Sequence, residues 1–343
     1  MMDLRFERLA DGSGYRVGHA LIDEFLEFAA GRARENTIRA YAHDLKIFFD
    51  AVGKEPGEVT PRDVISFVAA QQRPRAGEEN LVRMSDRGTG LSASTIKRRL
   101  AAVSSLYGYL LVRGECGVMI NPVPRGLPTR RSRHRDQRGA PLVRGVRRLP
   151  KVLEIHQTEA LIGALRTDRD RAMIQAMLLG GLRRCEVLGL RLEDLRLGTS
   201  QVFIRDGKGG HERVVPLSHT FFATVARYLD RERPLDAPTE QLFVVLKGPR
   251  RGMALSEDGL DEILLGARRR SGLSHCTCHE LRHTCFTRLR QAGMAIEAIQ
   301  AQAGHRSIAS TRIYLHLGAD WLAGEYRRAA EAIETQASIG TQS

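Results

Sequence analysis

Residues 201–217 read QVFIRDGKGGHERVVPL, and this stretch decides the fold class. Residues 201–205 and 213–217 alternate as strands do, around the glycine-rich turn DGKGG at 206–210, and this pattern predicts a β-hairpin. Longer segments with apolar residues at helical spacing lie on both sides of it. We therefore expect a mainly α-helical protein, with a small β-hairpin or sheet in an α+β second half.

The first part of the chain carries four helical patterns and no convincing strand. The patterns cover residues 20–30, 37–50, 60–70 and 92–113. The third begins with Thr60 and Pro61, a capping residue followed by proline at the first helical position. The polar residues 73–90 are expected to form a loop. The pattern predicts a four-helix unit.

After residue 150 the pattern is mixed. Apart from the hairpin, helices are expected at residues 156–165, 170–179, 186–192 and 221–231, and further helices up to about residue 336. Residues 241–246 are compatible with a short strand. The second part is therefore expected to be the α+β domain.

Positive charge is concentrated between these two parts. The chain has 53 Lys and Arg against 40 Asp and Glu, a net charge of +13, which indicates a polyanionic partner. Residues 123–151 alone contain ten Lys and Arg against Asp136, together with prolines and glycines that break regular structure. We interpret this segment as an interdomain linker whose side chains can lie along the phosphates of a nucleic acid; the alternative is a solvated hinge without a bound partner.

Membrane and secreted classes are not supported. No apolar run approaches the roughly 18 residues of a membrane span, and the first nine residues are too charged for a signal peptide. The five cysteines are an odd number in a chain too large to need disulfides. We expect a soluble, cytoplasmic protein with no membrane partner.

Several polar residues stand in otherwise apolar surroundings, and the two arginines, one lysine and two histidines among them suit a phosphate ester. They are Arg183, Glu186, Lys208, His279, Arg282, His305 and Tyr314. Arginine is permanently charged and matches phosphate oxygens with two parallel hydrogen bonds. Such donors stabilise the negative charge of a phosphoryl transition state. Tyr314 would be the nucleophile, since nearby cations favour its phenolate.

Four motifs in this order resemble the tyrosine recombinase/integrase family. They are GLRRCEVLGLRLEDL (181–195), GKGGHERVVPL (207–217), HELRHT (279–284) and GHRSIASTRIYLHL (304–317). In the first part, ENTIRAYAHDL (35–45) and STIKRRLAAVSSLYGYL (94–110) resemble the helical core-binding domain of that family. The resemblance implies a Xer-like recombinase or mobile-element integrase.

The resemblance also implies a role for each residue. Arg183 and Arg282 would hold the scissile phosphate, Lys208 would protonate the leaving 5′ oxygen, and His279 would assist proton transfer. His305 would bind a non-bridging oxygen, and Tyr314 would form a 3′-phosphotyrosyl link. Glu186 would orient the basic groups from behind them. The link conserves the bond energy, so neither a metal nor another cofactor is expected.

The same resemblance suggests the domain boundaries and the partners. We expect an N-terminal tail at 1–14, a SAM-like core-binding domain at 15–121, a basic linker at 122–150, a catalytic domain at 151–336 and a C-terminal tail at 337–343. Candidate DNA contacts are Thr37, Lys97, Arg98, Arg99, Arg130, Arg131 and Arg133; for residues 97–99 a solvated face is the alternative. Double-stranded DNA would be held by a homotetramer, or by a heterotetramer with a paralogue, for integration, transposition or dimer resolution.

Other interpretations remain open. A type IB topoisomerase would share the tyrosine chemistry, and a DNA-binding regulator would lack it. Residues 279–283, HELRH, match the zinc-protease pattern H-E-x-x-H, but Leu289 occupies the position of the third ligand. Cys276 and Cys278 lack a second metal-binding pair and are expected to be ordinary thiols.

Overall fold

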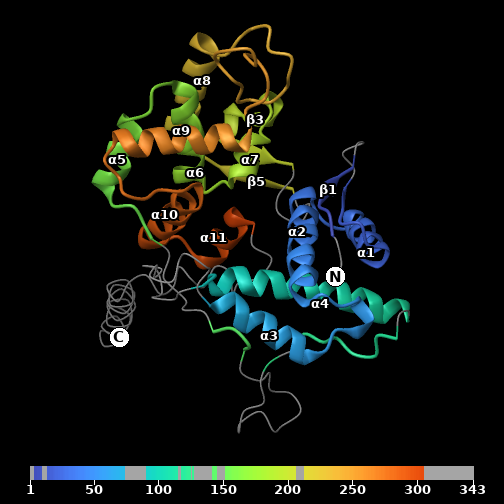
Figure 1. Ribbon diagram of the computed structural model, residues 1–343. Coiled ribbons are helices and arrows are strands. Elements are labelled where there is room, and N and C mark those ends of the chain that lie inside the picture. Colours follow the sequence, from blue (N-terminus) through green and yellow to red (C-terminus); the bar gives the residue numbers. More distant parts are fainter. Residues whose placement is uncertain are drawn as a thin grey trace, which may run out of the picture. The chain divides into compact units, whose positions relative to one another are not determined.

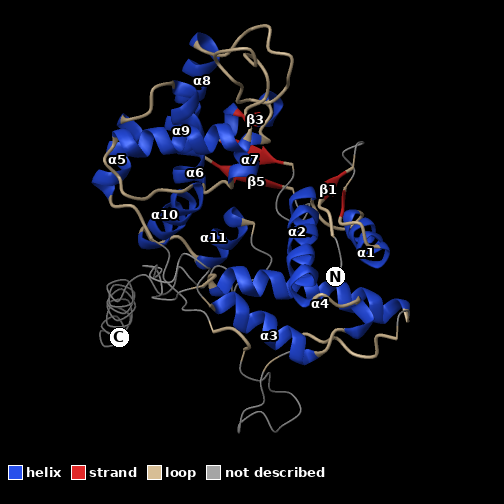
Figure 2. Ribbon diagram, in the orientation of Figure 1, coloured by secondary structure: helices blue, strands red, loops and turns tan. Residues whose placement is uncertain are grey.

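The computed structural model describes residues 4–9, 14–73, 90–114, 117–124, 126, 141–144, 151–205 and 212–304. The chain forms two compact units, residues 1–147 and 148–343, and each has its own apolar core. In the described ranges helices dominate both units, and the strands form two small antiparallel sheets (Figures 1 and 2). The predicted fold class, mainly helical with a small sheet, is confirmed.

Four helices build the first unit. They are α1 (Ala20–Ala30), α2 (Glu35–Val52), α3 (Pro61–Gln72) and α4 (Ala93–Arg113), with a 3-10 turn η1 at Pro56–Glu58. Their apolar stripes meet in one core, in which Phe48 and Phe49 are fully buried. Thr60 is the predicted cap of α3, and the structure adds a reciprocal bond from Asp63.

The N-terminal residues differ from the prediction. Instead of a tail at 1–14 and no strand, β1 (Glu7–Arg8) pairs with β2 (Tyr15–Arg16), and Leu4 is 4% exposed in the first core. Two-residue strands are too short to produce an alternation that a sequence pattern can reveal. Residues 4–9 therefore pack with the helical unit.

Part of the expected linker also joins the first core. Val143 is 3% exposed, and Leu142 packs beside it on that core. Of the basic linker residues, Arg130, Arg131 and Arg133 lie outside the described residues. The expected loop at 73–90 also falls largely outside them.

The second unit is built around α6 (Asp168–Gly180), which is buried on almost every side. It packs on α8 (His219–Arg231) and α10 (Cys278–Gln291). The other helices are α5 (Ile155–Gly163), α7 (Arg184–Leu188), α9 (Glu257–Arg270) and α11 (Ile296–Ala303), with 3-10 turns η2 (Leu192–Asp194) and η3 (Leu197–Thr199). Because residues on almost every side of α6 are buried, among them the polar Arg169, Asp170 and Gln175, this helix forms the centre of the core.

The predicted hairpin strands pair, and a third strand joins them. β4 (Gln201–Ile204) lies between β5 (Arg213–Pro216) and β3 (Leu195–Arg196), and Val202 faces Val215 across the ladder. The turn residues 206–211 lie outside the described residues. The short strand suggested at 241–246 is wrong, because residues 241 and 244 form only isolated bridges.

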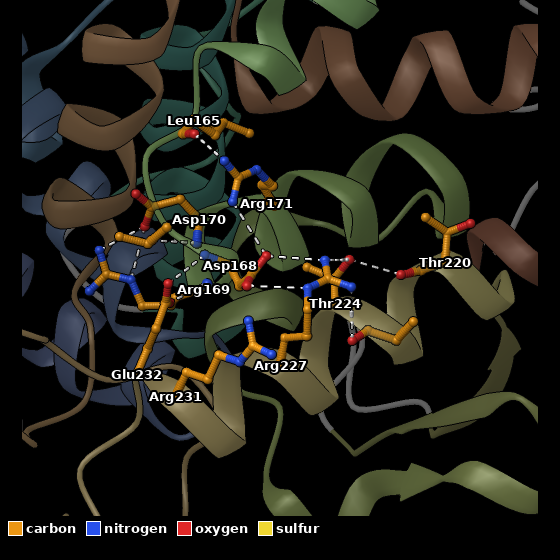
Figure 3. Close-up of polar contacts among 12 residues, drawn as sticks. Leu165, Asp168, Arg169, Asp170, Arg171, Thr220, Thr224, Arg227, Arg231 and Glu232 are labelled. Atoms are coloured by element: carbon orange, nitrogen blue, oxygen red, sulfur yellow. Dashed lines mark hydrogen bonds and ion pairs between the residues drawn. The ribbon is translucent and has the colours of Figure 1, made fainter.

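The N-terminus of α6 is anchored by a polar network (Figure 3). Both oxygens of the Glu232 carboxylate accept backbone N–H groups, from Asp168 at 2.8 Å and Arg169 at 2.9 Å. Asp168 in turn accepts hydrogen bonds from Arg171 and Arg227. A carboxylate at a helix N-terminus satisfies free N–H groups and complements the helix dipole. Glu232 therefore holds the first turn of α6 against α8.

No helix in the described ranges is both long and apolar enough to cross a membrane.

Candidate active site

The C-terminal end of α6 sets the position of Arg183. Gly181 ends the helix with φ +66°, a left-handed conformation that glycine adopts without strain. Arg183 is the N-cap residue of α7, so only a short turn separates its side chain from the rigid α6. The spacing of Arg183 and Glu186, on which the sequence prediction relied, is thus a helix-capping arrangement.

Glu186 is enclosed by arginines. Its side chain is fully buried and accepts hydrogen bonds from the Arg183 backbone at 2.9 Å and the Arg183 guanidinium at 2.6 Å. Arg213 donates to both carboxylate oxygens at 3.0 and 2.8 Å, and Arg282 approaches to 3.9 Å. Burial alone would raise the pKa of Glu186, but the arginine contacts, Arg213 foremost, lower it to about 2. The carboxylate is therefore a permanent anion behind the arginines.

Arg282 comes from α10 and is 4% exposed. Its guanidinium donates to the carbonyl of Gly181 and, at 2.7 Å, to that of Ala303 at the end of α11. It also lies over the ring of Phe286, 4.8 Å from the ring centroid. Arg282 thus connects α6, α10 and α11, and its position is fixed by three elements.

Three of the predicted residues line one cavity. Arg183, His279 and Arg282 line a cavity of about 630 Å³ together with residues of α9, among them Leu264 and Arg268. Two fixed guanidinium groups and an imidazole at one opening form a site for an anion such as a phosphodiester. Lys208, His305 and Tyr314 lie outside the described residues.

His279 is paired with the next histidine on its helix face. The Nε2 atoms of His279 and His283 are 2.8 Å apart, so one ring donates a hydrogen bond to the other. Burial, then the neighbouring His279 and Arg282, lower the pKa of His283 to about 4, and desolvation, Arg282 and Arg183 lower the pKa of His279. Both rings are therefore neutral at pH 7.

The His283 pKa predicts a loss of stability in acid. The unfolded chain binds a proton near pH 6.5, whereas the folded protein binds it near pH 4, so stability falls as the pH is lowered through this interval. We expect the free energy of unfolding to drop by about 1–2 kcal/mol more between pH 7 and pH 5 in the wild type than in His283→Gln. Denaturant unfolding at both pH values measures it. His156→Gln, on the exposed side of α5, is the control and should behave as wild type.

Gly181 offers a second test of the site's construction. A Cβ atom there would stand 2.4 Å from Phe286, the ring that supports Arg282. Gly181→Ala should therefore add a steric clash to the strain of a left-handed alanine and lower the free energy of unfolding by about 2–4 kcal/mol. Gly272 has a similar φ of +72° with open space around it. Gly272→Ala should cost only the backbone strain, about 1 kcal/mol, and equal losses in the two variants would contradict this account of Gly181.

The zinc-protease pattern has a different role in this structure. His279 and His283 bond to each other, and the Glu280 carboxylate accepts from His275 and from the Thr277 backbone, which it caps. Within the described ranges no group of three or more His, Cys, Asp or Glu is arranged to hold a metal ion.

Two tyrosines and two cysteines of the described residues are side chains of the core. Tyr107 and Tyr228 are buried, and their hydroxyls donate to the backbone carbonyls of Pro56 and Leu242. Cys276 and Cys285 are buried thiols whose pKa is raised to about 12 by desolvation. The expectation that Cys276 is an ordinary thiol agrees with this environment.

The candidate DNA contacts of the first unit fall into two groups. Thr37 and Lys97 are exposed, and Arg98 is half exposed while it pairs with Asp44. Arg99 differs from the prediction: it is 7% exposed, and its guanidinium faces Gln71 and the fully buried Asp44. Buried charge requires a partner, so Arg99 belongs to the interior of this unit.

Arg213 is the residue that sequence reasoning missed. It stands in the quoted motif GKGGHERVVPL, but its chemistry is evident only once β5 is folded against α7 and α11. The sequence did contain one signal for it: Arg213 is followed by the apolar residues VVPL. A charged residue in such a strand is expected to have a buried partner of opposite charge.

Comparisons with known proteins assign both parts of the chain to one family. Residues 151–320 match the phage integrase family, and residues 22–114 match the phage integrase N-terminal SAM-like domain. The tyrosine recombinase XerC of Roseiflexus sp. (strain RS-1) is 31% identical over 322 residues, which cover 90% of this chain and 91% of that protein. The chain belongs to the tyrosine recombinase family.

Solved structures share the fold of this recombinase. The XerH site-specific recombinase bound to a palindromic difH substrate, in a post-cleavage complex, has a TM-score of 0.64 at 18% identity, covering 95% of this chain and 92% of that chain. A lambda integrase tetramer bound to a Holliday junction has a TM-score of 0.61 at 17% identity, covering 88% of this chain and 79% of that chain.

The family assigns the activity. The chain is a tyrosine site-specific recombinase, an enzyme that breaks and rejoins DNA, with a SAM-like N-terminal domain and a catalytic domain. The prediction of family and activity from the sequence motifs is confirmed.

Proposed function

We propose that this recombinase cuts DNA through a 3′-phosphotyrosyl intermediate formed by Tyr314. The observation that carries the proposal is the common cavity of Arg183, His279 and Arg282, with Glu186 buried behind it. The two arginines bind the non-bridging oxygens of the scissile phosphate. His305 adds a further bond to one of these oxygens.

The proton transfers follow from the charge changes. The Tyr314 hydroxyl oxygen attacks phosphorus and loses its proton with the assistance of His279, which is neutral at pH 7 because its pKa is lowered. The bond to the 5′ oxygen breaks, and Lys208 protonates that oxygen. The attack of a 5′ hydroxyl on the phosphotyrosyl link reverses these steps and rejoins the strand, so neither ATP nor a metal ion or other cofactor enters the scheme.

The partner is double-stranded DNA, gripped mainly through its phosphates. We assign Thr37, Lys97 and Arg98 to contacts in the core-binding domain (15–121), and Arg130, Arg131 and Arg133 to contacts in the linker (122–150). The catalytic domain (151–336) holds the scissile strand. Because these contacts release counterions, affinity should fall steeply with salt concentration.

Four protomers act on two sites, since two duplexes must each be cut on both strands. The lambda integrase tetramer on a Holliday junction supports this assembly for a protein of the same fold. The assembly is a homotetramer or a heterotetramer with a paralogue, in the cytoplasm. The biological outcome is integration, transposition or dimer resolution.

A library of nicked duplexes with randomised sequence tests the proposal. The nick lets the short fragment that carries the free 5′ hydroxyl escape, so a phosphotyrosyl enzyme accumulates and resists detergent. We expect the wild type to capture a defined subset of the duplexes covalently. If no covalent complex forms at any sequence, the proposed chemistry is wrong and a DNA-binding regulator becomes the better description.

A supercoiled plasmid that carries two captured sites separates a recombinase from a type IB topoisomerase. Deletion or inversion of the DNA between the sites is expected from site-specific recombination. Relaxation without recombinants would favour the topoisomerase.

A further inference from the structure

Arg213 is the cation that most directly opposes Glu186, yet it stands apart from the cavity. Its guanidinium donates to both Glu186 oxygens, at 3.0 and 2.8 Å, and its side chain is 12% exposed. Among the described residues that line the cavity, Arg183 and Arg282 are present and Arg213 is not. Arg213 therefore contacts the carboxylate without being among the described residues that line the cavity.

The charges around Glu186 explain why a third arginine is needed. Arg183 and Arg282 approach the same carboxylate, at 2.6 and 3.9 Å. With Arg213 present, the cluster of Arg183, Arg213, Arg282 and Glu186 carries a net charge of two positive units, and removal of Arg213 would reduce it to one. A carboxylate without Arg213 would draw the two remaining guanidinium groups toward itself, because the attraction between charges is strong where water is excluded.

Arg213 also connects three parts of the site. It begins β5, its Nε donates to the carbonyl of Gln302 in α11 at 3.0 Å, and a Cβ on Gly304 would stand 3.1 Å from its Nη1. Gln302 in turn donates to the carbonyl of Gly180 at the end of α6. One guanidinium thus ties the β-sheet to α7 and α11, both of which pack beside α6.

We propose that Arg213 is a positioning residue of strand cleavage, which holds and neutralises Glu186 so that Arg183 and Arg282 remain directed at the scissile phosphate. This inference rests on the proposed function. If the proposal holds, Glu186 slows strand cleavage when Arg213 is absent and supports it when Arg213 is present.

The test is the single-turnover rate of covalent complex formation on a nicked duplex captured from the random library, with protein in excess. Arg213→Ala should bind this duplex within about threefold of wild type and cleave it about 10–100-fold more slowly, the usual effect of losing a residue that supports a reacting group. Arg213→Lys keeps the positive charge but lacks the planar pair of donors, so its cleavage rate should lie between those of the wild type and Arg213→Ala.

The decisive variant is Arg213→Ala combined with Glu186→Gln. The substitution of Glu186 removes the unopposed carboxylate and restores two positive charges, so the double variant should cleave at least about tenfold faster than Arg213→Ala. A purely structural role, through the bond to Gln302, gives no such recovery. A double variant no faster than Arg213→Ala would overturn the proposal, as would an Arg213→Ala that cleaves at the wild-type rate.

Arg205 provides a matched control in the same sheet region. It too pairs with a buried carboxylate, that of Asp194 at 2.7 Å, but neither Asp194 nor Arg205 lines the cavity. Arg205→Ala should lower the melting temperature about as much as Arg213→Ala and leave the cleavage rate of bound DNA unchanged. If Arg213→Ala fails to fold, Arg213→Gln with and without Glu186→Gln carries the same comparison, because it also removes the positive charge that opposes Glu186. A wild type that traps no DNA would instead refute the proposed function itself.

Discussion

Tyr314→Phe is expected to bind the captured duplex as tightly as the wild type and to form no covalent complex. The substitution removes one oxygen atom, the nucleophile of the proposed reaction, and no other group can form the phosphotyrosyl bond. The expected loss is at least about 10⁴-fold in cleavage rate, comparable with removal of the nucleophile from other enzymes that act through a covalent intermediate.

Two tyrosines of the described region serve as controls for this variant. Tyr109→Phe removes a hydroxyl that accepts a hydrogen bond from Arg113 on the surface of α4, and it should cleave at the wild-type rate. Tyr228→Phe removes a buried hydroxyl that bonds to the carbonyl of Leu242; it should be less stable but still form the covalent complex. A covalent complex in Tyr314→Phe would assign the nucleophile to another residue.

Arg282→Ala is expected to cleave about 10²–10³-fold more slowly than the wild type, with DNA affinity reduced only a few fold. The guanidinium is fixed by α6, α11 and the Phe286 ring before substrate binds, so its full effect is exerted on the charge that develops in the transition state. Most of the binding energy comes from phosphates elsewhere along the duplex.

For variants of Arg282, the free energy of unfolding must be measured together with the cleavage rate. Arg282→Ala leaves the carbonyls of Gly181 and Ala303 without this donor, which lowers the free energy of unfolding by about 1–3 kcal/mol. Arg282→Lys retains a charge and one donor and should recover stability more than cleavage, since a lysine lacks the planar pair of donors. An equal loss of DNA binding and cleavage would mean that Arg282 anchors DNA rather than stabilising the transition state.

Helices with a regular apolar stripe were predicted well from the sequence. α1 has the predicted bounds, and α4 begins one residue later than predicted, because Ser92 is its N-cap. The residues of the cavity were found because their types and spacings match a family motif, while the physical chemistry of each residue separately would have left them as ordinary surface charges.

Features that depend on distant partners were not predictable. In the sequence, Arg99 was predicted to share a DNA-contacting surface with Lys97 and Arg98. In the fold it is buried, because Asp44 of α2 lies beside it as a charged partner. Arg213 likewise acquires its role from Glu186 and Gln302. In both cases a polar residue at a helical or strand position finds its partner through tertiary packing, which local periodicity does not encode.

The central helix α6 is held at both ends, and this limits the insertions and deletions that the segment can accept. Its first turn is fixed by Glu232, its last by Gln302 and the Arg282 contact, and its 13 residues span the distance between them. A single inserted residue would turn everything after it by about 100° and advance it by about 1.5 Å. Such an insertion would point Arg183 away from the phosphate, so this segment tolerates exchange of residues and not change of length. Engineers who transfer it between recombinases should therefore move residues 168–186 as one cassette.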